Sequence, residues 1–175
     1  HALVAMDFMQ QTVAMTGIEP IRLPDQIELS RAIPAAVALA PEHLRSAVEL
    51  ICVAIAENTV TGDVAAFARD DTVKPSIKGL MADHLLDEGR HSSFWARMVR
   101  IYWHTASEAD RGTIAQILPV FIGHYLTNDI QKSFDLRLSE ARQVSEVTRL
   151  SLKEEMTGLA FPINRHHPLV GNIIK

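Results

Sequence analysis

The sequence predicts an all-α fold built from long antiparallel helices, and three observations support this prediction. Hydrophobic residues make up 47% of the 175 residues and charged residues 22%, which suits a soluble domain with one sizeable core. Long stretches with helical periodicity alternate with short segments rich in proline, glycine or aspartate. No convincing strand, internal repeat or glycine-rich phosphate loop is visible. We therefore expect residues 1–157 to form part of a single helical domain and residues 158–175 to form a tail.

Start and stop signals give the predicted helices in order. A helix over residues 1–16 should end at Gly17, and the segment 17–41, which contains four prolines, should be a connection with room for a short helical turn. Ser107 and Asp110 resemble a capping box at the start of a helix that Pro119 should kink. The remaining predicted helices cover residues 41–69, about 75–104 and 141–156.

Composition narrows the functional classes. The formal net charge of -4 gives no electrostatic footprint for nucleic acid, so we expect no nucleic-acid partner. No stretch approaches the ~18 apolar residues of a membrane span, and no signal peptide is visible, so we expect no membrane partner. The single cysteine, Cys52, lies in an apolar run and suits a small buried thiol in a reducing cytoplasm. The chain opens at His1 in mid-helix register, which predicts that an upstream part is missing.

The stretch 82–91 carries the most informative pattern. His84, Glu88 and His91 follow helical spacing, so they share one face of a helix. Leucines on both sides make that helix apolar enough to be buried. A buried carboxylate between two histidines is costly unless a cation holds it, and a metal ion is the usual solution. The alternative is a polar network in a metal-free bundle.

Glu57 lies in an otherwise apolar part of the preceding predicted helix. Glu57 and His84 stand on opposite sides of Asp71 in the sequence, at nearly equal separations from it. Because the two helices should be antiparallel and each residue rises about 1.5 Å, Glu57 should lie opposite His84 and Glu88. A Glu-x-x-His element met by a Glu from a neighbouring helix is the half-site of carboxylate-bridged di-iron and di-manganese bundles.

Four segments resemble the p-aminobenzoate N-oxygenase (AurF-like) family, and the resemblance covers roughly residues 52–137. These segments are 57–59, 66–75, 84–91 and 117–119. The resemblance implies a ferritin-like helical bundle that carries a non-haem di-iron centre. It also implies that the helices preceding His1 in the family are absent from this sequence.

The family's His-x-x-x-Glu-x-x-His motif corresponds to His84, Glu88 and His91, and its Glu on the preceding helix corresponds to Glu57. The His of its first Glu-x-x-His corresponds to His1. Two further glutamate ligands of the family would precede His1 and have no counterpart here. The resemblance thus implies five metal ligands in this chain.

The resemblance further implies an oxidoreductase, a mono-oxygenase with two iron ions that uses O2 to oxidise the nitrogen of a small-molecule amine. Arylamines would be oxidised first to the hydroxylamine and then to the nitro compound, and the enzyme would serve biosynthesis. Electrons would come from an external reductase or reductant, and the protein would be a homodimer. The ligand types suit manganese as well as iron. The alternatives are another ferritin-like di-iron oxidase, of hydroxylase or desaturase type, and a non-catalytic metal-binding or interaction bundle.

Two roles around the centre remain open at this point. Asp87 could accept the free imidazole N–H of His1 and fix its tautomer, or it could form a surface salt bridge with Arg90 or Arg97.

Val60, Thr61 and Val64 share the face of Glu57 and could line a substrate pocket together with Tyr125. The alternative for these four side chains is ordinary helix packing.

Overall fold

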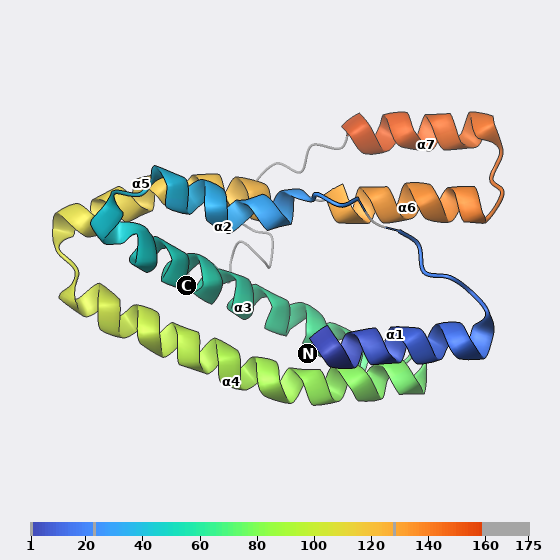
Figure 1. Cartoon of the computed structure of the whole chain (residues 1–175), viewed down its shortest axis with the longest axis horizontal. Coiled ribbons are helices and arrows are strands. Elements are labelled where there is room, and N and C mark those ends of the chain that lie inside the picture. The colour runs from blue at the N-terminus through green and yellow to red at the C-terminus, as the bar shows by residue number, and fades with distance from the viewer. Residues whose placement is uncertain (1, 23, 128, 159–175) are drawn as a thin grey trace. The chain divides into compact units, whose positions relative to one another are not determined.

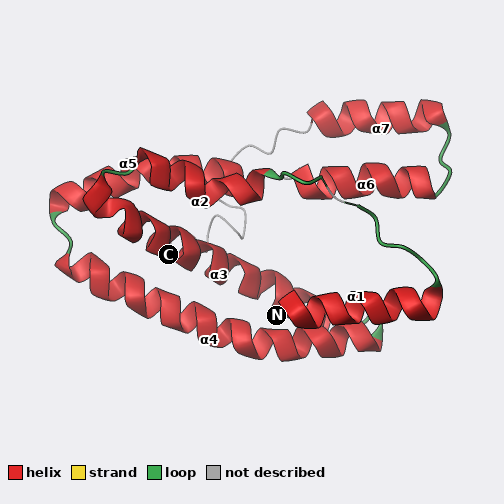
Figure 2. Ribbon diagram, in the orientation of Figure 1, coloured by secondary structure: helices red, strands yellow, loops and turns green. Residues whose placement is uncertain are grey.

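The structure, a computed structural model, describes residues 2–22, 24–127 and 129–158. These residues form helices and loops without a strand, so the predicted all-α fold is confirmed (Figures 1 and 2). The helices are α1 (Ala2–Thr16), α2 (Glu28–Leu39), the short 3-10 helix η1 (Glu42–Leu44), α3 (Arg45–Arg69), α4 (Pro75–Thr105), α5 (Glu108–Tyr125), α6 (Asp129–Ala141) and α7 (Glu146–Gly158). They fall into two compact units, one with α2 to α5 and one with α1, α6 and α7.

Helices α3 and α4 pack along each other as an antiparallel pair (Figure 1). The tight connection between them is held by Asp70, whose Oδ1 accepts hydrogen bonds from the backbone N–H of Thr72 at 2.8 Å and from its hydroxyl at 2.7 Å. These two bonds lower the pKa of the Asp70 carboxyl. Pro75 then occupies the first turn of α4, where its missing N–H costs nothing. The pair therefore matches the two helices predicted over 41–69 and 75–104.

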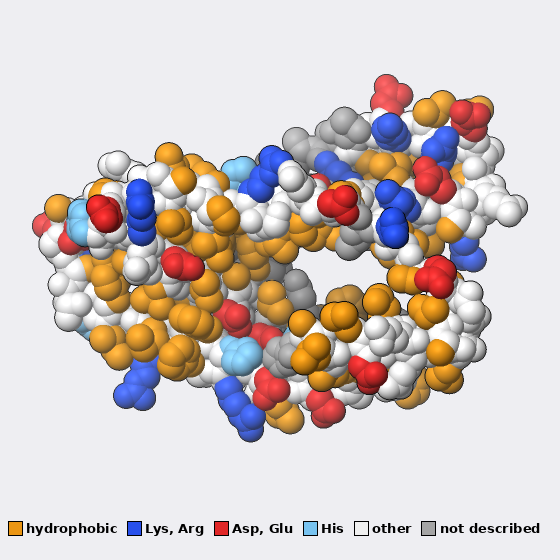
Figure 3. Space-filling model, in the orientation of Figure 1, with side chains coloured by type: hydrophobic (Ala, Val, Ile, Leu, Met, Phe, Trp, Pro, Cys, Tyr) orange, Lys and Arg blue, Asp and Glu red, His pale blue; other side chains and the backbone are white. Residues whose placement is uncertain are grey.

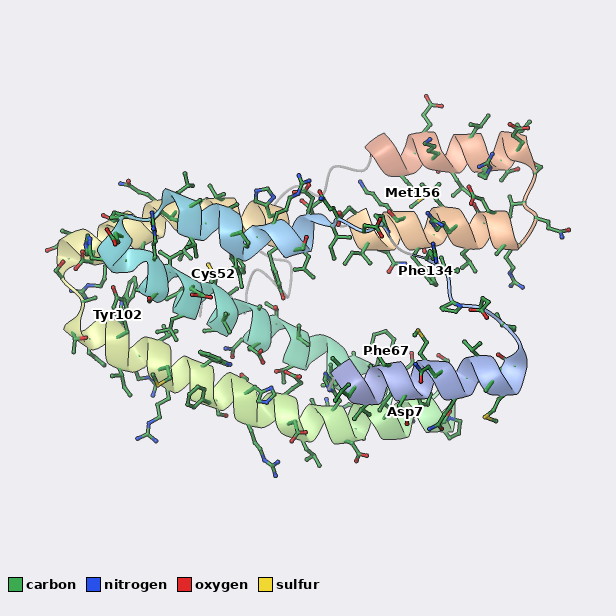
Figure 4. All side chains as sticks on the ribbon, viewed as in Figure 1. Asp7, Cys52, Phe67, Tyr102, Phe134 and Met156 are labelled. Carbon is green, nitrogen blue, oxygen red and sulfur yellow. The ribbon has the colours of Figure 1, made fainter. Side chains whose placement is uncertain are left out.

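Helices α2 and α5 cover the half of α3 that begins at Arg45. The core between them consists of small side chains on α2, mid-sized ones on α3 and larger ones on α5, and α4 adds Tyr102 at its edge (Figure 4). Phe121, Ile114, Val48 and Cys52 are its largest fully buried side chains. Ala32 and Ala36 are buried on α2, and their small size lets the helices approach closely. Apolar burial therefore stabilises this half of the unit.

Helix α2 was not predicted, because its residues lie within the expected connection over 17–41. Pro34 lies inside it, and a proline normally argues against a helix because it lacks an N–H and crowds the preceding turn. Burial of Ala32 and Ala36 against α5 and α3 outweighs that cost. Tertiary packing thus overrides the local signal.

Helix α5 begins as the sequence indicated. The Ser107 hydroxyl accepts a hydrogen bond from the backbone N–H of Asp110 at 3.1 Å and donates to the Asp110 carboxylate at 2.8 Å. These bonds, with a contribution from His43, lower the pKa of Asp110. Pro119 lies inside the helix, which continues to Tyr125.

The second unit corrects the prediction of one helix over 141–156. Helix α6 ends at Ala141, and α7 begins only at Glu146, packed against α6. Gln143 turns the chain between them with a φ of 53°, which is rare for a residue other than glycine. Helix α1 ends before Gly17, as predicted, and Gly17 has a φ of 66°. The predicted tail over 158–175 lies outside the described residues except for Gly158.

One helical stretch, residues 42–69, has the length and hydropathy of a membrane span. The buried core helix of a soluble protein passes the same test, so this observation is weak. In this chain the first half of the stretch packs against α2 and α5. The expectation of no membrane partner stays a prediction.

Candidate metal site

Glu57 lies in the middle of α3, where the part that α2 and α5 cover comes to its end. Its Oε2 is buried and has no hydrogen-bond partner among the described residues. Burial raises the pKa of Glu57, and the nearby negative charge of Glu88 raises it further. The neighbouring His91 lowers the pKa of Glu57, and a hydrogen bond with Glu88 raises it. The folded chain therefore holds this carboxyl where its charged form lacks full compensation.

Glu88 is the buried polar residue of α4, with 5% of its surface exposed. Its two carboxylate oxygens face different histidines on the same helix. Oε1 lies 3.1 Å from Nε2 of His84, one turn before it, and Oε2 lies 3.8 Å from Nδ1 of His91, one turn after it. One carboxylate thus has a nitrogen donor on each side, as helical spacing predicted.

His91 completes a cluster that spans the two helices. Its Nδ1 lies 3.5 Å from Oε2 of Glu57. Ligand atoms of Glu57, Glu88 and His91 all lie within 4.8 Å of one another. Two carboxylates and an imidazole are ligands that Fe²⁺ and Mn²⁺ accept, and a divalent cation would compensate the Glu57 Oε2 atom, which makes no hydrogen bond among the described residues. These residues therefore fit a metal ion chemically.

The register of the two helices differs slightly from the predicted one. Glu57 meets Glu88 and His91, whereas the count from Asp71 placed it opposite His84 and Glu88. The reason is that residues 70–74 are not helical. The separation along the chain from Glu57 to Arg69, the end of α3, equals the separation from Pro75, the start of α4, to Asp87. Glu57 should therefore lie level with Asp87. Counting from the helix ends therefore moves the partner about one turn along α4.

The other predicted ligand and its partner remain predictions. His1 lies outside the described residues. Asp87 forms a salt bridge of 3.0 Å with Arg90, one turn later, and both side chains are largely exposed. That contact is the surface pair considered as the alternative role for Asp87.

The predicted pocket residues have different surroundings. Val64 is buried, and Val60 is 38% exposed. The Thr61 hydroxyl donates to the backbone carbonyl of Glu57 at 2.9 Å. The Tyr125 ring stacks on Phe121, with ring centroids 5.2 Å apart. A hollow of about 690 Å³ on α4 is lined by other residues, namely Ser92, Ser93, Ala96, Arg97, Arg100, Ile101 and His104. A pocket at Val60, Thr61, Val64 and Tyr125 stays a prediction.

Three polar residues beside the cluster were missed by the sequence analysis. Asn58 and Thr59 follow Glu57, and Ser92 follows His91. Ser92 bonds to Asn58 across the two helices, and the buried Thr59 hydroxyl bonds to the hydroxyl of Tyr125 on α5. Their position next to candidate ligands was the one available signal, because serine, threonine and asparagine also occur at exposed helical positions.

Comparison with known proteins gives one match. The family model of the p-aminobenzoate N-oxygenase AurF matches residues 6–157, which is most of the chain. No curated protein and no solved structure matches. The all-α fold agrees with the ferritin-like bundle that the sequence resemblance implied. The extent of the match shows that the chain belongs to the p-aminobenzoate N-oxygenase AurF family.

Proposed function

We propose that this chain is part of a non-haem di-iron oxygenase that uses O2 to oxidise the nitrogen of a small-molecule amine. Family membership supports the reaction class, since the family is one of di-iron N-oxygenases. The observation that carries the proposal is the buried Oε2 of Glu57, which lies beside Glu88 and His91 without a hydrogen-bond partner among the described residues. A metal-free bundle would be more stable if an apolar side chain replaced such a group, whereas a metal site requires the carboxylate as a ligand.

In this proposal Glu57, Glu88, His84 and His91 hold iron. The two oxygens of Glu88 lie beside different histidines, so Glu88 would hold metal together with His84 and with His91. His1 is a further proposed ligand, and Asp87 is proposed to orient it. Bound iron would supply the binding and reduction of O2. The carboxylates would balance the charge of the ions.

The proposed reaction balances with an external two-electron donor. One oxygen atom of O2 enters an N–H bond of the amine to give a hydroxylamine. The other oxygen atom leaves as water with two protons and two electrons from a reductant. Further rounds of oxidation would give the nitro compound. We propose aryl amines as the substrate class, a reductase or small reductant as the donor, and a homodimer as the assembly.

Iron loading of the full-length protein tests this function. We expect two ferrous ions per chain after anaerobic loading, and O2-dependent oxidation of at least one member of a panel of aryl and alkyl amines in the presence of a reductant. Glu88→Gln should remove most of the bound iron because it takes away the shared carboxylate. Glu49→Gln makes the same change at an exposed position of α3 and should leave iron content unaltered.

Three outcomes separate the alternatives. Fewer than two irons per chain would contradict the di-iron proposal. Two irons with oxidation at carbon and none at nitrogen would favour the hydroxylase or desaturase type. Bound metal without O2 consumption would favour a non-catalytic metal-binding bundle.

A further inference from the structure

Two candidate metal ligands are each followed by a residue whose side chain crosses between the helices. Asn58 follows Glu57 on α3, and Ser92 follows His91 on α4. The Ser92 hydroxyl donates a hydrogen bond to Oδ1 of Asn58 at 2.7 Å. The two bonded residues are 34 positions apart in sequence, so the bond links the two helices rather than successive turns of one.

The orientation of the Asn58 amide is determined by a second hydrogen bond. Its Nδ2 donates to the backbone carbonyl of Ala54 at 2.7 Å, and a carbonyl can only accept. The amide nitrogen is therefore directed at α3 itself, which leaves Oδ1 as the acceptor for Ser92. Both bonds have ordinary lengths for their donor types.

The Asn58–Ser92 bond lies directly beside the contact between Glu57 and His91. Successive residues of a helix differ by about 100° in direction and only about 1.5 Å in height. The two contacts are therefore neighbours along the line where α3 and α4 meet, which we call the seam. Sliding either helix by one residue would break a 2.7 Å bond. The bond is thus made at the same register at which Oε2 of Glu57 lies 3.5 Å from Nδ1 of His91.

A second hydrogen bond, from α5, contacts α3 at the same level along its axis. The hydroxyls of Thr59 and Tyr125 form a hydrogen bond, and the Thr59 hydroxyl also donates to the backbone carbonyl of Ala56 at 2.8 Å. Thr59 is almost fully buried, with 3% of its surface exposed. Helix α5 thus fixes the turn that carries Glu57, and the Ser92 bond positions α4 against a fixed turn.

We propose that Asn58 and Ser92 are positioning residues that set the spacing of Glu57 and His91 for a divalent cation. This inference rests on the proposed metal-binding function. The pair does not touch the cation, and it acts by holding the two ligands in register. The hydroxyl of residue 92 is the group required, so a side chain that keeps the hydroxyl should keep the effect.

Cobalt binding to the full chain tests the inference without an activity assay. Co²⁺ is titrated into metal-free protein, and its visible absorption reports both affinity and ligand geometry. Ser92→Ala should weaken binding by about fivefold, the effect of losing one hydrogen bond. It should also shift the absorption bands. Ser92→Thr should restore both the affinity and the bands.

Ser93→Ala is the matched control. It removes the same hydroxyl from the next position of α4, where the group donates only to the carbonyl of Gly89 in its own helix, at 2.8 Å. We expect wild-type affinity and bands for this variant. Equal behaviour of Ser92→Ala and Ser93→Ala, or failure of Ser92→Thr to restore the bands, would overturn the inference.

A second measurement separates this inference from the proposed function. Absence of cobalt binding by the wild type would overturn the function, and thermal unfolding of the metal-free chain would still decide the positioning role. Glu57→Gln should raise the melting temperature less in the Ser92→Ala background than in the wild type, because the released helix can move the carboxylates apart. The Ser93→Ala background should keep the full increase. Equal increases in all three backgrounds would overturn the positioning role.

Discussion

Along the α3–α4 pair, two halves of one structure are stabilised in different ways. In the half covered by α2 and α5, the core contains Val48, Cys52 and Phe121, each without measurable exposure. In the half that ends at the connection over 70–74, the seam carries Glu57, Glu88 and His91 instead. The first half gains free energy by burying apolar surface. The second half holds like charges close together, an arrangement that becomes favourable when a cation is bound.

Exposed apolar side chains occur along both halves of α4. Large hydrophobic side chains remain exposed on α4, among them Leu86 at 67%, Phe94 at 56% and Ile101 at 54% (Figure 3). Cys52 shows the opposite environment. Its burial raises the pKa of the thiol to about 12, so it is an inert core group rather than a nucleophile. The stability of this unit therefore comes mainly from the half of the α3–α4 pair that α2 and α5 cover. The candidate metal ligands lie in the other half.

Removing the largest buried side chain should have the greatest effect on stability. Phe121→Ala should lower the free energy of unfolding by about 3–5 kcal/mol, because it leaves a cavity between α5 and its neighbours and removes the stacking on Tyr125. Denaturant unfolding followed by circular dichroism measures the loss. A change below about 1 kcal/mol would mean that the apolar half is not the source of stability.

Neutralising the half-buried Glu57 should raise, rather than lower, the stability of the metal-free protein. The pKa of Glu57 is raised by burial, so the protonated form contributes stability that is lost as the pH rises through the raised pKa. Glu57→Gln should therefore raise the melting temperature near pH 7 by roughly 2–4 °C, and the gain should vanish below the unfolded-state pKa. Thermal unfolding at several pH values measures this, with Glu49→Gln as the exposed control on the same helix.

The same Glu57→Gln variant should bind divalent metal more weakly, because the cluster loses one of its two carboxylates. A variant that was less stable than the wild type at pH 7, yet bound metal normally, would remove the distinction between the two halves.

Loss of the α5 cap should cost less than loss of a core residue. Ser107→Ala should reduce the free energy of unfolding by about 1 kcal/mol, because the N–H of Asp110 loses its acceptor. Thr113→Ala in the same helix is the control, since its hydroxyl bonds only to the carbonyl of Ala109. Equal losses in the two variants, measured by denaturant unfolding, would count against the cap.

An exposed apolar residue in the second half should matter least. Leu86→Ala should change the free energy of unfolding by less than about 0.5 kcal/mol, as is usual for exposed positions. Denaturant unfolding measures the change. A loss of about 2 kcal/mol or more would show that Leu86 is buried in the protein as it exists in solution, and the contrast between the halves would need revision.

Sequence reasoning worked where the signals were local. The Ser107 cap, the Pro75 start and the turn at Asp70 involve side chains that bond within a few residues, so they could be read directly. Helix α2 was missed because the proline signal at Pro34 was stronger than the packing signal of its alanines. The turn at Gln143 was missed because its positive φ occurs without a glycine.

The site shows the same limit. Helical spacing predicted that His84, Glu88 and His91 share a face, and the two contacts of Glu88 with these histidines lie along α4 as that spacing requires. To predict which residues of α4 lie opposite Glu57, the true ends of both helices had to be known. A count from Asp71 did not supply them. The Asn58–Ser92 bond joins residues far apart in sequence, and no local pattern encodes such a bond.

The short connection between α3 and α4 also has a kinetic consequence. Glu57, Glu88 and His91 all belong to one helical hairpin, so the group can assemble without distant parts of the chain. Contacts within one hairpin span fewer residues than the contacts between α2 and α5, so they require less loop closure. The polar seam should therefore form while α5 is still unstructured. A cation that binds this hairpin would then stabilise it before the rest of the unit folds. The short connection would thus decide whether metal binding precedes or follows folding.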